Sequence, residues 1–320
     1  MNNKSKLSEM LTNEQIDCIF YKHFLIHIEG VRQLHGGMFN TTYLVRSKNE
    51  QYILRVGPVH TDLLLPFEQH LGESEVYVCN LLQENNIPAN QPLISDFSKQ
   101  IINRDYMIFS YIDGINMSEK EVKKSNKPNL QKQVGAVTKR IHQITGDYFG
   151  RVSDSFKGVT FSKWCDYLFY ELQTLIKSCK KHNVFSEKIL IDIECLFEQG
   201  KPYLNYISSP KLVHMDLWEG NIMIDKNQKQ ILAVIDTDRC LFGDPDMDLA
   251  NPWLITEDFL EGYGELPHSK YRDIKILYYR LLYSIIDAYV WKVEYCNKLN
   301  YWKSFRQVKS LMKQINSFYK

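Results

Sequence analysis

The sequence of 320 residues has no excess of charge and no long apolar segment. Its 39 Lys and Arg residues face 38 Asp and Glu residues, which gives a formal net charge of +1. That balance provides no positive field for nucleic acid or for an anionic membrane. No apolar run approaches the roughly 18 residues of a membrane-spanning helix, and the polar start lacks the apolar core of a signal peptide. We therefore expect a cytoplasmic protein that binds neither nucleic acid nor membrane.

The chain also lacks paired cysteines. Its seven cysteines are odd in number, and none follows the C-x-x-C spacing of zinc sites and redox motifs; they stand at positions 18, 79, 165, 179, 195, 240 and 296. A disulfide framework and a thiolate metal site are therefore not expected. Buried thiols in a reducing compartment fit this pattern better.

Polar residues gather around a predicted hairpin in the second half of the chain. Apolar segments at 221–224 and 231–235 have strand character and flank a short turn. Asp216 lies in the loop before the hairpin, Asn221 opens its first strand and Asp236 closes its second. The hairpin would therefore bring two carboxylates and an amide oxygen to one of its edges. Such oxygen ligands suit Mg²⁺, with Asn221 and Asp236 as its protein ligands and Asp216 left to orient or deprotonate a hydroxyl.

The spacing of these residues is that of a kinase catalytic loop. In His214-x-Asp216-x4-Asn221 the Asp corresponds to the base and the Asn to a metal ligand. Together with Asp236 and the segment 242–250 that follows it, the motif resembles the aminoglycoside phosphotransferase and choline kinase family. This family is the small-molecule branch of the protein-kinase-like fold. The resemblance covers most of the chain.

The resemblance implies an α+β, bilobal, protein-kinase-like fold. A nucleotide-binding lobe with an antiparallel sheet would span residues 1–109, and a larger, mainly helical lobe for catalysis and acceptor binding would span 110–320. The family often has Gly where Met215 stands. Gly-Asp-Pro at 243–245 follows Asp236 after only six residues. The Asp-Phe-Gly, long activation segment and Ala-Pro-Glu of protein kinases do not occur here. A protein substrate is therefore not expected.

Two further segments would bind the nucleotide if the resemblance holds. Gly36 and Gly37 lie between two strand-like segments, and glycine lets backbone N–H groups approach a phosphate closely. A glycine pair on its own is more often an ordinary hairpin turn. The strand near 106–111 then breaks into Asp-Gly, which marks a turn. In the family this is the hinge, where backbone groups of Ser110 and Ile112 would bond the adenine edge.

A cation among apolar neighbours marks the third predicted strand. Arg55 stands where protein kinases have the Lys that pairs with nucleotide phosphates and a helix Glu. Its guanidinium can bind phosphate or carboxylate through two parallel hydrogen bonds. Glu73 and Glu75, on a helix predicted over 72–85, are both candidate partners. The family pattern favours Glu75, seven residues before Leu82.

The remaining polar residues near the motif have structural interpretations. Asp238 is a second candidate for the metal, although Arg239 could neutralise it instead. Asp248 would cap a helix and brace the catalytic loop. His142, on an amphipathic helix, is expected to be a hydrogen-bonded packing residue, and His214 to brace the loop through hydrogen bonds.

The helical C-terminal part is rich in aromatic residues and carries an acidic cluster, Glu257, Asp258, Glu261 and Glu265. In the family the acceptor lies between these helices and the catalytic loop. Carboxylates would suit a polyamine and aromatic faces a quaternary ammonium. A solvated acidic face over an ordinary aromatic core explains the same residues and is the favoured interpretation.

The resemblance implies transfer of the ATP γ-phosphoryl group, with Mg²⁺, to a hydroxyl of a small molecule. An aminoglycoside or similar amino sugar is the first choice of acceptor, and choline, a macrolide, a ketosamine or homoserine is the alternative. Trp218-Glu219-Gly220 resembles the Trp-Ser-Gly of ketosamine kinases at one point. A catalytically silent nucleotide-binding relative is the competing class, against which the complete set of Asp216, Asn221 and Asp236 argues. GTP in place of ATP and the oligomeric state stay open.

Overall fold

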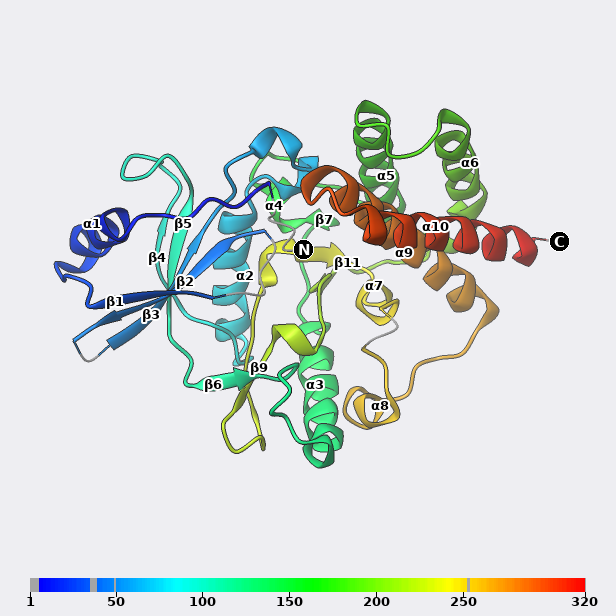
Figure 1. Cartoon of the computed structure of the whole chain (residues 1–320). Helices are drawn as coiled ribbons and strands as arrows, with labels where there is room; N and C mark the ends of the chain where they lie inside the picture. The colour runs from blue at the N-terminus through cyan, green and yellow to red at the C-terminus, as the bar shows by residue number, and fades with distance from the viewer. Residues whose placement is uncertain (1–5, 35–38, 49, 252–253, 320) are drawn as a thin grey trace.

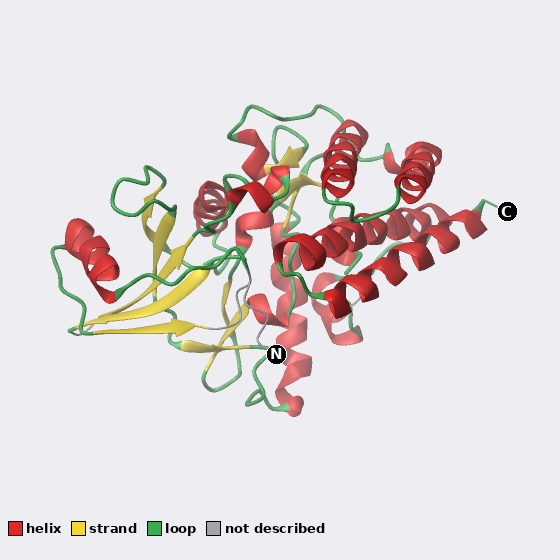
Figure 2. Ribbon diagram, turned by 45° about the horizontal axis from the view of Figure 1, so that its top comes forward, coloured by secondary structure: helices red, strands yellow, loops and turns green. Residues whose placement is uncertain are grey.

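The computed structural model describes residues 6–34, 39–48, 50–251 and 254–319 (Figure 1). The chain folds into an N-terminal lobe with an antiparallel sheet and a larger, mainly helical C-terminal lobe, as predicted. Figure 2 shows the long strands on one side of the molecule and most helices on the other. Within the described part, no helix is both long enough and apolar enough to cross a membrane.

Five antiparallel strands form the sheet of the N-terminal lobe. Their order is β1-β2-β3-β5-β4, with bounds Gly30–Leu34, Thr41–Ser47, Glu50–Val56, Tyr106–Ser110 and Pro92–Asp96. Side chains alternate between the two faces of a strand. Leu54 and Val56 therefore pack in the cluster beneath α1 (Asn13–Phe24), whereas Arg55 points to the opposite face, where α2 (Leu71–Glu84) lies. This alternation sets the direction of the one cation of β3.

A local signal fixes the start of α1. Thr12 caps α1, because its side chain accepts a bond from the Gln15 N–H while the Gln15 side chain accepts from the Thr12 N–H. This cap stands immediately before the first residue of α1, Asn13. The helix predicted at 72–85 is α2, shifted by one residue. The predicted lobe boundary at 109/110 falls one residue before the end of β5.

Long helices supply the core of the C-terminal lobe. Four of them, α5, α6, α9 and α10, share one large apolar cluster, while α3 packs against α8. The helices of this lobe are α3 (Lys127–Ile141), α4 (Val152–Ser155), α5 (Trp164–Lys181), α6 (Glu187–Leu204), α7 (Asp246–Leu249), α8 (Glu257–Tyr263), α9 (Lys270–Tyr289) and α10 (Lys298–Phe318). A π-helical turn, Val290–Glu294, continues α9.

Two small antiparallel sheets lie between the lobes and position the site. One contains β6 (Gly114–Asn116), β9 (Ile222–Asp225) and β10 (Ile231–Val234); the other contains β7 (Gly150–Arg151), β8 (Lys211–Val213) and β11 (Leu241–Gly243). The loop 214–221 runs from β8 to β9, and the segment 235–240 runs from β10 to β11. Both polar segments therefore cross between the same two sheets.

The predicted hairpin is present, with one difference in its first strand. Asn221 does not open β9 but ends a 3₁₀ turn, Glu219–Asn221, immediately before it. The turn keeps the Asn221 side chain on the side of the preceding loop, where it bonds Asp216. A further 3₁₀ turn, Thr237–Arg239, follows Asp236 after β10.

Candidate active site

A buried carboxylate holds the backbone of the loop 214–221. Asp248 on α7 accepts hydrogen bonds from the N–H groups of His214 (2.9 Å) and Met215 (2.8 Å). His142 Nε2 lies 3.0 Å from the same carboxylate. Burial alone would raise the pKa of Asp248, but His142 and the backbone donors reverse this and hold the pKa below its usual value. Asp248 thus braces the loop as predicted, although it lies inside α7 and caps no helix.

Histidine hydrogen bonds tie the two polar segments together. The His214 Nε2–H donates to the Ile235 carbonyl (3.1 Å), while Nδ1 accepts from the Asp216 N–H (3.3 Å). The Ile235 N–H in turn donates to the Asn221 carbonyl (3.0 Å). Burial lowers the pKa of His214, which agrees with a neutral ring carrying its proton on Nε2. The predicted bracing role of His214 is confirmed.

The backbone turns sharply at Met215, just before the candidate base. Its φ is +71°, in the left-handed region that glycine adopts without strain. This is the position at which the resembling family often has Gly. The Met215 side chain is buried, and its sulfur accepts a bond from the Tyr283 hydroxyl (3.3 Å).

Asp216 lies half-buried at the end of this turn. The Asn221 Nδ2 group donates both to its carbonyl (2.8 Å) and to its carboxylate (3.1 Å). Burial, together with the nearby charge of Asp236, raises the pKa of Asp216 to about 7, against the opposing effect of Arg239. A carboxylate with a pKa close to neutrality can accept a proton from a bound hydroxyl near physiological pH.

An ion-pair network joins the N-terminal lobe to the candidate metal ligand. Arg55 Nη1 lies 2.5 Å from Glu75 Oε1, and Nη2 lies 2.6 Å from Asp236 Oδ1. Glu73 instead pairs with His70 (2.8 Å), so the geometry favours Glu75 as predicted. Burial would raise the pKa of Asp236, but Arg55 lowers it below the usual value. The Asp236 carboxylate is therefore ionised and anchored at one oxygen.

The second acidic residue of this segment points into the protein. Asp238 is buried, 3.7 Å from Arg55, and burial together with Asp236 raises its pKa well above the usual value. The sequence suggested that Arg239 could neutralise Asp238, but Arg239 does not form its ion pair with that residue. It pairs with Glu68 (2.6 Å), which arrives from a distant part of the chain. Asp238 is thus less accessible to a cation than Asp236.

The donor set near Asp216 fits a hard cation that keeps water and phosphate ligands. Asn221 uses its amide nitrogen for Asp216, which leaves the amide oxygen to face a cation. Asp236 uses one oxygen for Arg55, and its side chain is 31% exposed. Among the described residues, no group of three or more His, Cys, Asp and Glu side chains forms a metal site. Two protein ligands are what Mg²⁺ commonly uses beside substrate phosphates.

The residues of the N-terminal lobe that are predicted to bind a nucleotide are placed only in part. Gly36 and Gly37 lie outside the described residues. At the predicted hinge, the Ser110 N–H donates to the Gln91 carbonyl (3.0 Å) and the Ile112 carbonyl accepts from the Gly114 N–H (2.9 Å). In the described chain the Ile112 N–H has no backbone acceptor, so this donor is available for the predicted bond to a nucleotide.

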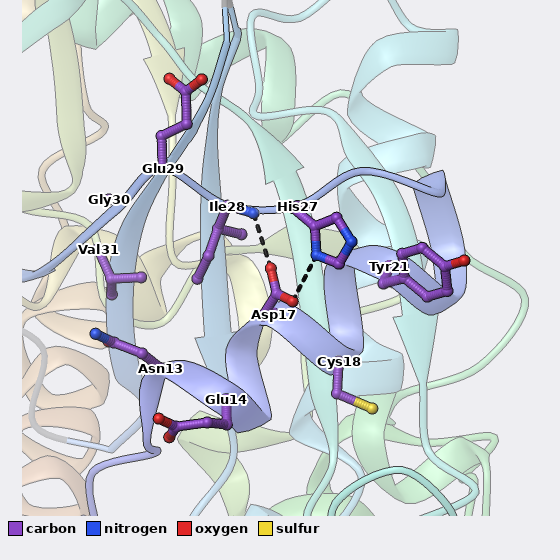
Figure 3. A pocket seen from close by; sticks show the side chains of 10 residues that line it. All are labelled: Asn13, Glu14, Asp17, Cys18, Tyr21, His27, Ile28, Glu29, Gly30 and Val31. Carbon is purple, nitrogen blue, oxygen red and sulfur yellow. Dashed lines mark hydrogen bonds and ion pairs between the residues drawn. The ribbon is translucent and has the colours of Figure 1, made fainter.

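A separate hollow lies on the N-terminal lobe, between α1 and β1 (Figure 3). Its volume is about 610 Å³, and all its lining residues fall within 13–31. Asp17 there accepts bonds from the His27 ring (2.8 Å) and the Ile28 N–H (2.9 Å). The hollow contains none of the predicted site residues, so it is not the catalytic cleft.

Comparison with known proteins identifies the family. The model of a family described as "Phosphotransferase enzyme family" matches residues 30–275 of the chain. The chain belongs to this family. The match spans parts of both lobes and includes every predicted site residue. This phosphotransferase is therefore a small-molecule kinase, as expected from the motif.

Relatives of the phosphotransferase differ in substrate and size. The "Probable ketoamine kinase" of Lactiplantibacillus plantarum is 25% identical over 251 residues, which cover 75% of this chain and 80% of that protein. "Acyl-CoA dehydrogenase family member 10" of Mus musculus is 26% identical over 221 residues, which cover 68% of this chain. The chain spans only 20% of the length of that mouse protein.

Solved structures of aminoglycoside kinases share the fold of the phosphotransferase. One is a thermostable mutant of the aminoglycoside phosphotransferase APH(4)-Ia in ternary complex with AMP-PNP and hygromycin B. Its TM-score is 0.67 at 17% identity, and the alignment covers 93% of this chain and 98% of that chain. At this identity the likeness establishes the fold.

Two features of the cleft carried no sequence signal. The pair of Arg239 and Glu68 joins residues 171 positions apart, which no local pattern reveals. Asp287 on α9 is also part of the surroundings of Asp216, since its charge contributes to the raised pKa of that carboxyl. In the sequence Asp287 is one acid among helical residues far from the motif.

Proposed function

We propose that this phosphotransferase moves the γ-phosphoryl group of ATP to a hydroxyl of a small amine-bearing acceptor, with an amino sugar as first choice. The observation that supports this most is the arrangement of Asp216, Asn221 and Asp236. Asp216 has a pKa of about 7 and is bonded to Asn221, while Asp236 is anchored by Arg55. The AMP-PNP in the APH(4)-Ia complex supports use of an adenine nucleotide.

Each residue has one task in the proposed reaction. Asp216 orients the acceptor hydroxyl and takes its proton, while the hydroxyl oxygen bonds the γ-phosphorus and the bond from that phosphorus to the β–γ bridging oxygen breaks. ADP then leaves with the bridging oxygen. Arg55, held by Glu75, steadies the nucleotide phosphates. A loose phosphoryl-transfer transition state requires mainly such placement and charge neutralisation.

Asn221 and Asp236 would hold Mg²⁺, which when bound neutralises charge on the β- and γ-phosphates. The backbone groups of Gly36 and Gly37 would cover these phosphates, and those of Ser110 and Ile112 would bind the adenine.

All seven cysteines are free thiols, which suits a reducing compartment and hence the cytoplasm.

The choice of acceptor rests on the relatives. The ketoamine kinase name of the Lactiplantibacillus relative supports a ketosamine, and the hygromycin B of the APH(4)-Ia complex supports an aminoglycoside. Both acceptors combine several hydroxyls with an amine. Choline, macrolides and homoserine have less support and serve as members of the test panel.

The experiment is ATP turnover with Mg²⁺ across aminoglycosides, ketosamines, choline, macrolides and homoserine, for the wild type and for Asp216→Ala. We expect turnover with an amino sugar that Asp216→Ala loses. If no acceptor raises turnover above that of the variant while ATP still binds, the chain is a silent nucleotide-binding relative. Turnover with a macrolide alone would reject the proposed acceptor class and keep the kinase.

A further inference from the structure

Positive charge is concentrated on the last long helix, α10. The whole chain has 39 Lys and Arg residues against 38 Asp and Glu residues, but residues 295–320 include six Lys and Arg residues and no Asp or Glu. Five of the six lie within α10, which ends on the side of the molecule opposite the N-terminal sheet (Figure 1). The balanced total therefore conceals one strongly basic element.

Four of these cations and one tryptophan form a row along the exposed face of α10. They follow one another at spacings of four, four, three and four residues, which keeps side chains on one face of a helix. We call this row the basic stripe, and its members are Lys298, Trp302, Arg306, Lys309 and Lys313. All five are exposed, and Trp302 is 51% exposed. The row is about 22 Å long.

The apolar face of α10 is not available to a partner. Val308, Leu311 and Ile315 are buried in the large apolar cluster of the C-terminal lobe. A partner of this helix therefore reaches only the basic stripe and the residues beside it, among them Leu299, which is 69% exposed.

The protein does not neutralise the charges of the basic stripe. Among the described residues, no carboxylate lies within 4.0 Å of its four cations. Further cations lie at both ends of α10, where Lys292 Nζ is 5.0 Å from the ring of Tyr301 and Lys270 Nζ is 4.9 Å from the ring of Phe318. A positive field therefore extends from this surface into the solvent.

The composition of the basic stripe favours one kind of anionic partner. Lysine is depleted in interfaces between proteins. Single-stranded nucleic acid is bound by successive aromatic rings on which its bases stack, whereas the stripe has the single ring of Trp302. A tryptophan among lysines is typical of a membrane interface, because the indole ring lies at the level of the headgroups and the lysines attract anionic lipids.

We propose that the basic stripe of α10 binds the surface of an anionic lipid bilayer, with Trp302 entering the headgroup region. Each cation near such a surface strengthens binding by a factor of about five. The expectation that the chain binds no membrane came from its total charge, which averages over this stripe. The cytoplasmic leaflet is the anionic one, so a peripheral position on it agrees with the expected cytoplasmic location. This binding does not depend on the proposed kinase function.

The test is sedimentation of the full chain with lipid vesicles at a salt concentration of about 0.1 M. One set of vesicles is phosphatidylcholine alone, and the other contains phosphatidylserine as well. The proteins are the wild type, Lys309→Gln/Lys313→Gln and the matched control Lys120→Gln/Lys124→Gln, which removes the same charge. Lys120 and Lys124 are exposed, four positions apart, between β6 and α3.

We expect the wild type and the control to bind the phosphatidylserine vesicles in preference to phosphatidylcholine alone, and Lys309→Gln/Lys313→Gln to bind them at least about 10-fold more weakly. Binding should disappear as the salt rises from about 0.1 M to about 1 M, because the Debye length shortens from about 10 Å to about 3 Å. Equal binding by the two double variants, or equal binding to both kinds of vesicle, would overturn the proposal.

Two further measurements test the tryptophan and the choice of partner. Brominated acyl chains in the phosphatidylserine vesicles should quench tryptophan fluorescence of the wild type more than that of Trp302→Phe, and equal quenching would remove Trp302 from the contact. A single-stranded oligothymidylate serves as the competing anion. Oligothymidylate binding that Lys309→Gln/Lys313→Gln loses, without vesicle binding by the wild type, would make the stripe a nucleic-acid surface and overturn the proposal.

Discussion

Asp248 supports the catalytic loop, and its contribution to the free energy of unfolding can be measured. Asp248→Asn replaces a carboxylate that accepts from His214 N–H, Met215 N–H and His142. An amide has one oxygen, so at least one of these donors would face an N–H₂ group instead. A buried donor left without a partner costs about 1–3 kcal/mol. We therefore expect Asp248→Asn to lower the free energy of unfolding by about 1–3 kcal/mol.

The assay is urea unfolding at pH 7 for the wild type, Asp248→Asn and a control, Asp192→Asn. Asp192 is 45% exposed and pairs with Lys188 on a helix surface, so its loss should cost only about 0.3–0.5 kcal/mol. A loss below about 1 kcal/mol for Asp248→Asn would refute the reasoning, because the buried bonds would then contribute no more than a surface pair.

The same variant has a defined pH dependence. The folded pKa of Asp248 is lower than its unfolded value, so its stabilisation is complete above the unfolded pKa of about 3.9 and disappears as the pH falls through the folded pKa. The difference in the free energy of unfolding between the wild type and Asp248→Asn should therefore be constant from pH 7 to pH 5 and become smaller below about pH 3.9. A difference that grows on acidification would contradict the assigned direction.

Substitutions at three further positions test the surroundings of the site. Arg55→Lys should largely keep activity, whereas Arg55→Ala should raise the apparent KM for ATP at least several-fold, since Glu75 and Asp236 lose their shared cation; equal kinetics in both would remove Arg55 from the nucleotide site. The free energy of unfolding of Met215→Gly should exceed that of Met215→Ala by up to about 1 kcal/mol, because only Ala keeps a side chain at φ +71°. Asp236→Asn should weaken Mg²⁺-dependent nucleotide binding, and an unchanged Mg²⁺ titration would exclude Asp236 as a ligand.

Local chemistry made parts of the fold predictable. Thr12 and Gln15 form a capping box that depends on residues three apart, so the start of α1 could be placed from the sequence. The motif around Asp216 predicted the hairpin of β9 and β10, because short strands and their turn are contiguous in the chain. Strand alternation in β3 then directs Arg55 toward α2 and Glu75.

Contacts between distant segments were beyond such reasoning. Glu68 and Arg239 lie 171 positions apart, and the sequence suggested the adjacent residue, Asp238, as the partner of Arg239. Asn221 ends a 3₁₀ turn and its side chain bonds Asp216, which strand propensity does not show. The exposure of Asp287 depends on how every neighbour packs around α9, so no periodic pattern in the helix predicts it.

The most direct measurement for the central claim is phosphoryl transfer by Asp216→Asn under saturating ATP, Mg²⁺ and acceptor, combined with the Kd for Mg²⁺-ATP. The account predicts a Kd close to that of the wild type and a kcat lower by about 10²–10⁴-fold, the range expected when a positioned base is removed. Transfer within a few-fold of the wild type would contradict it.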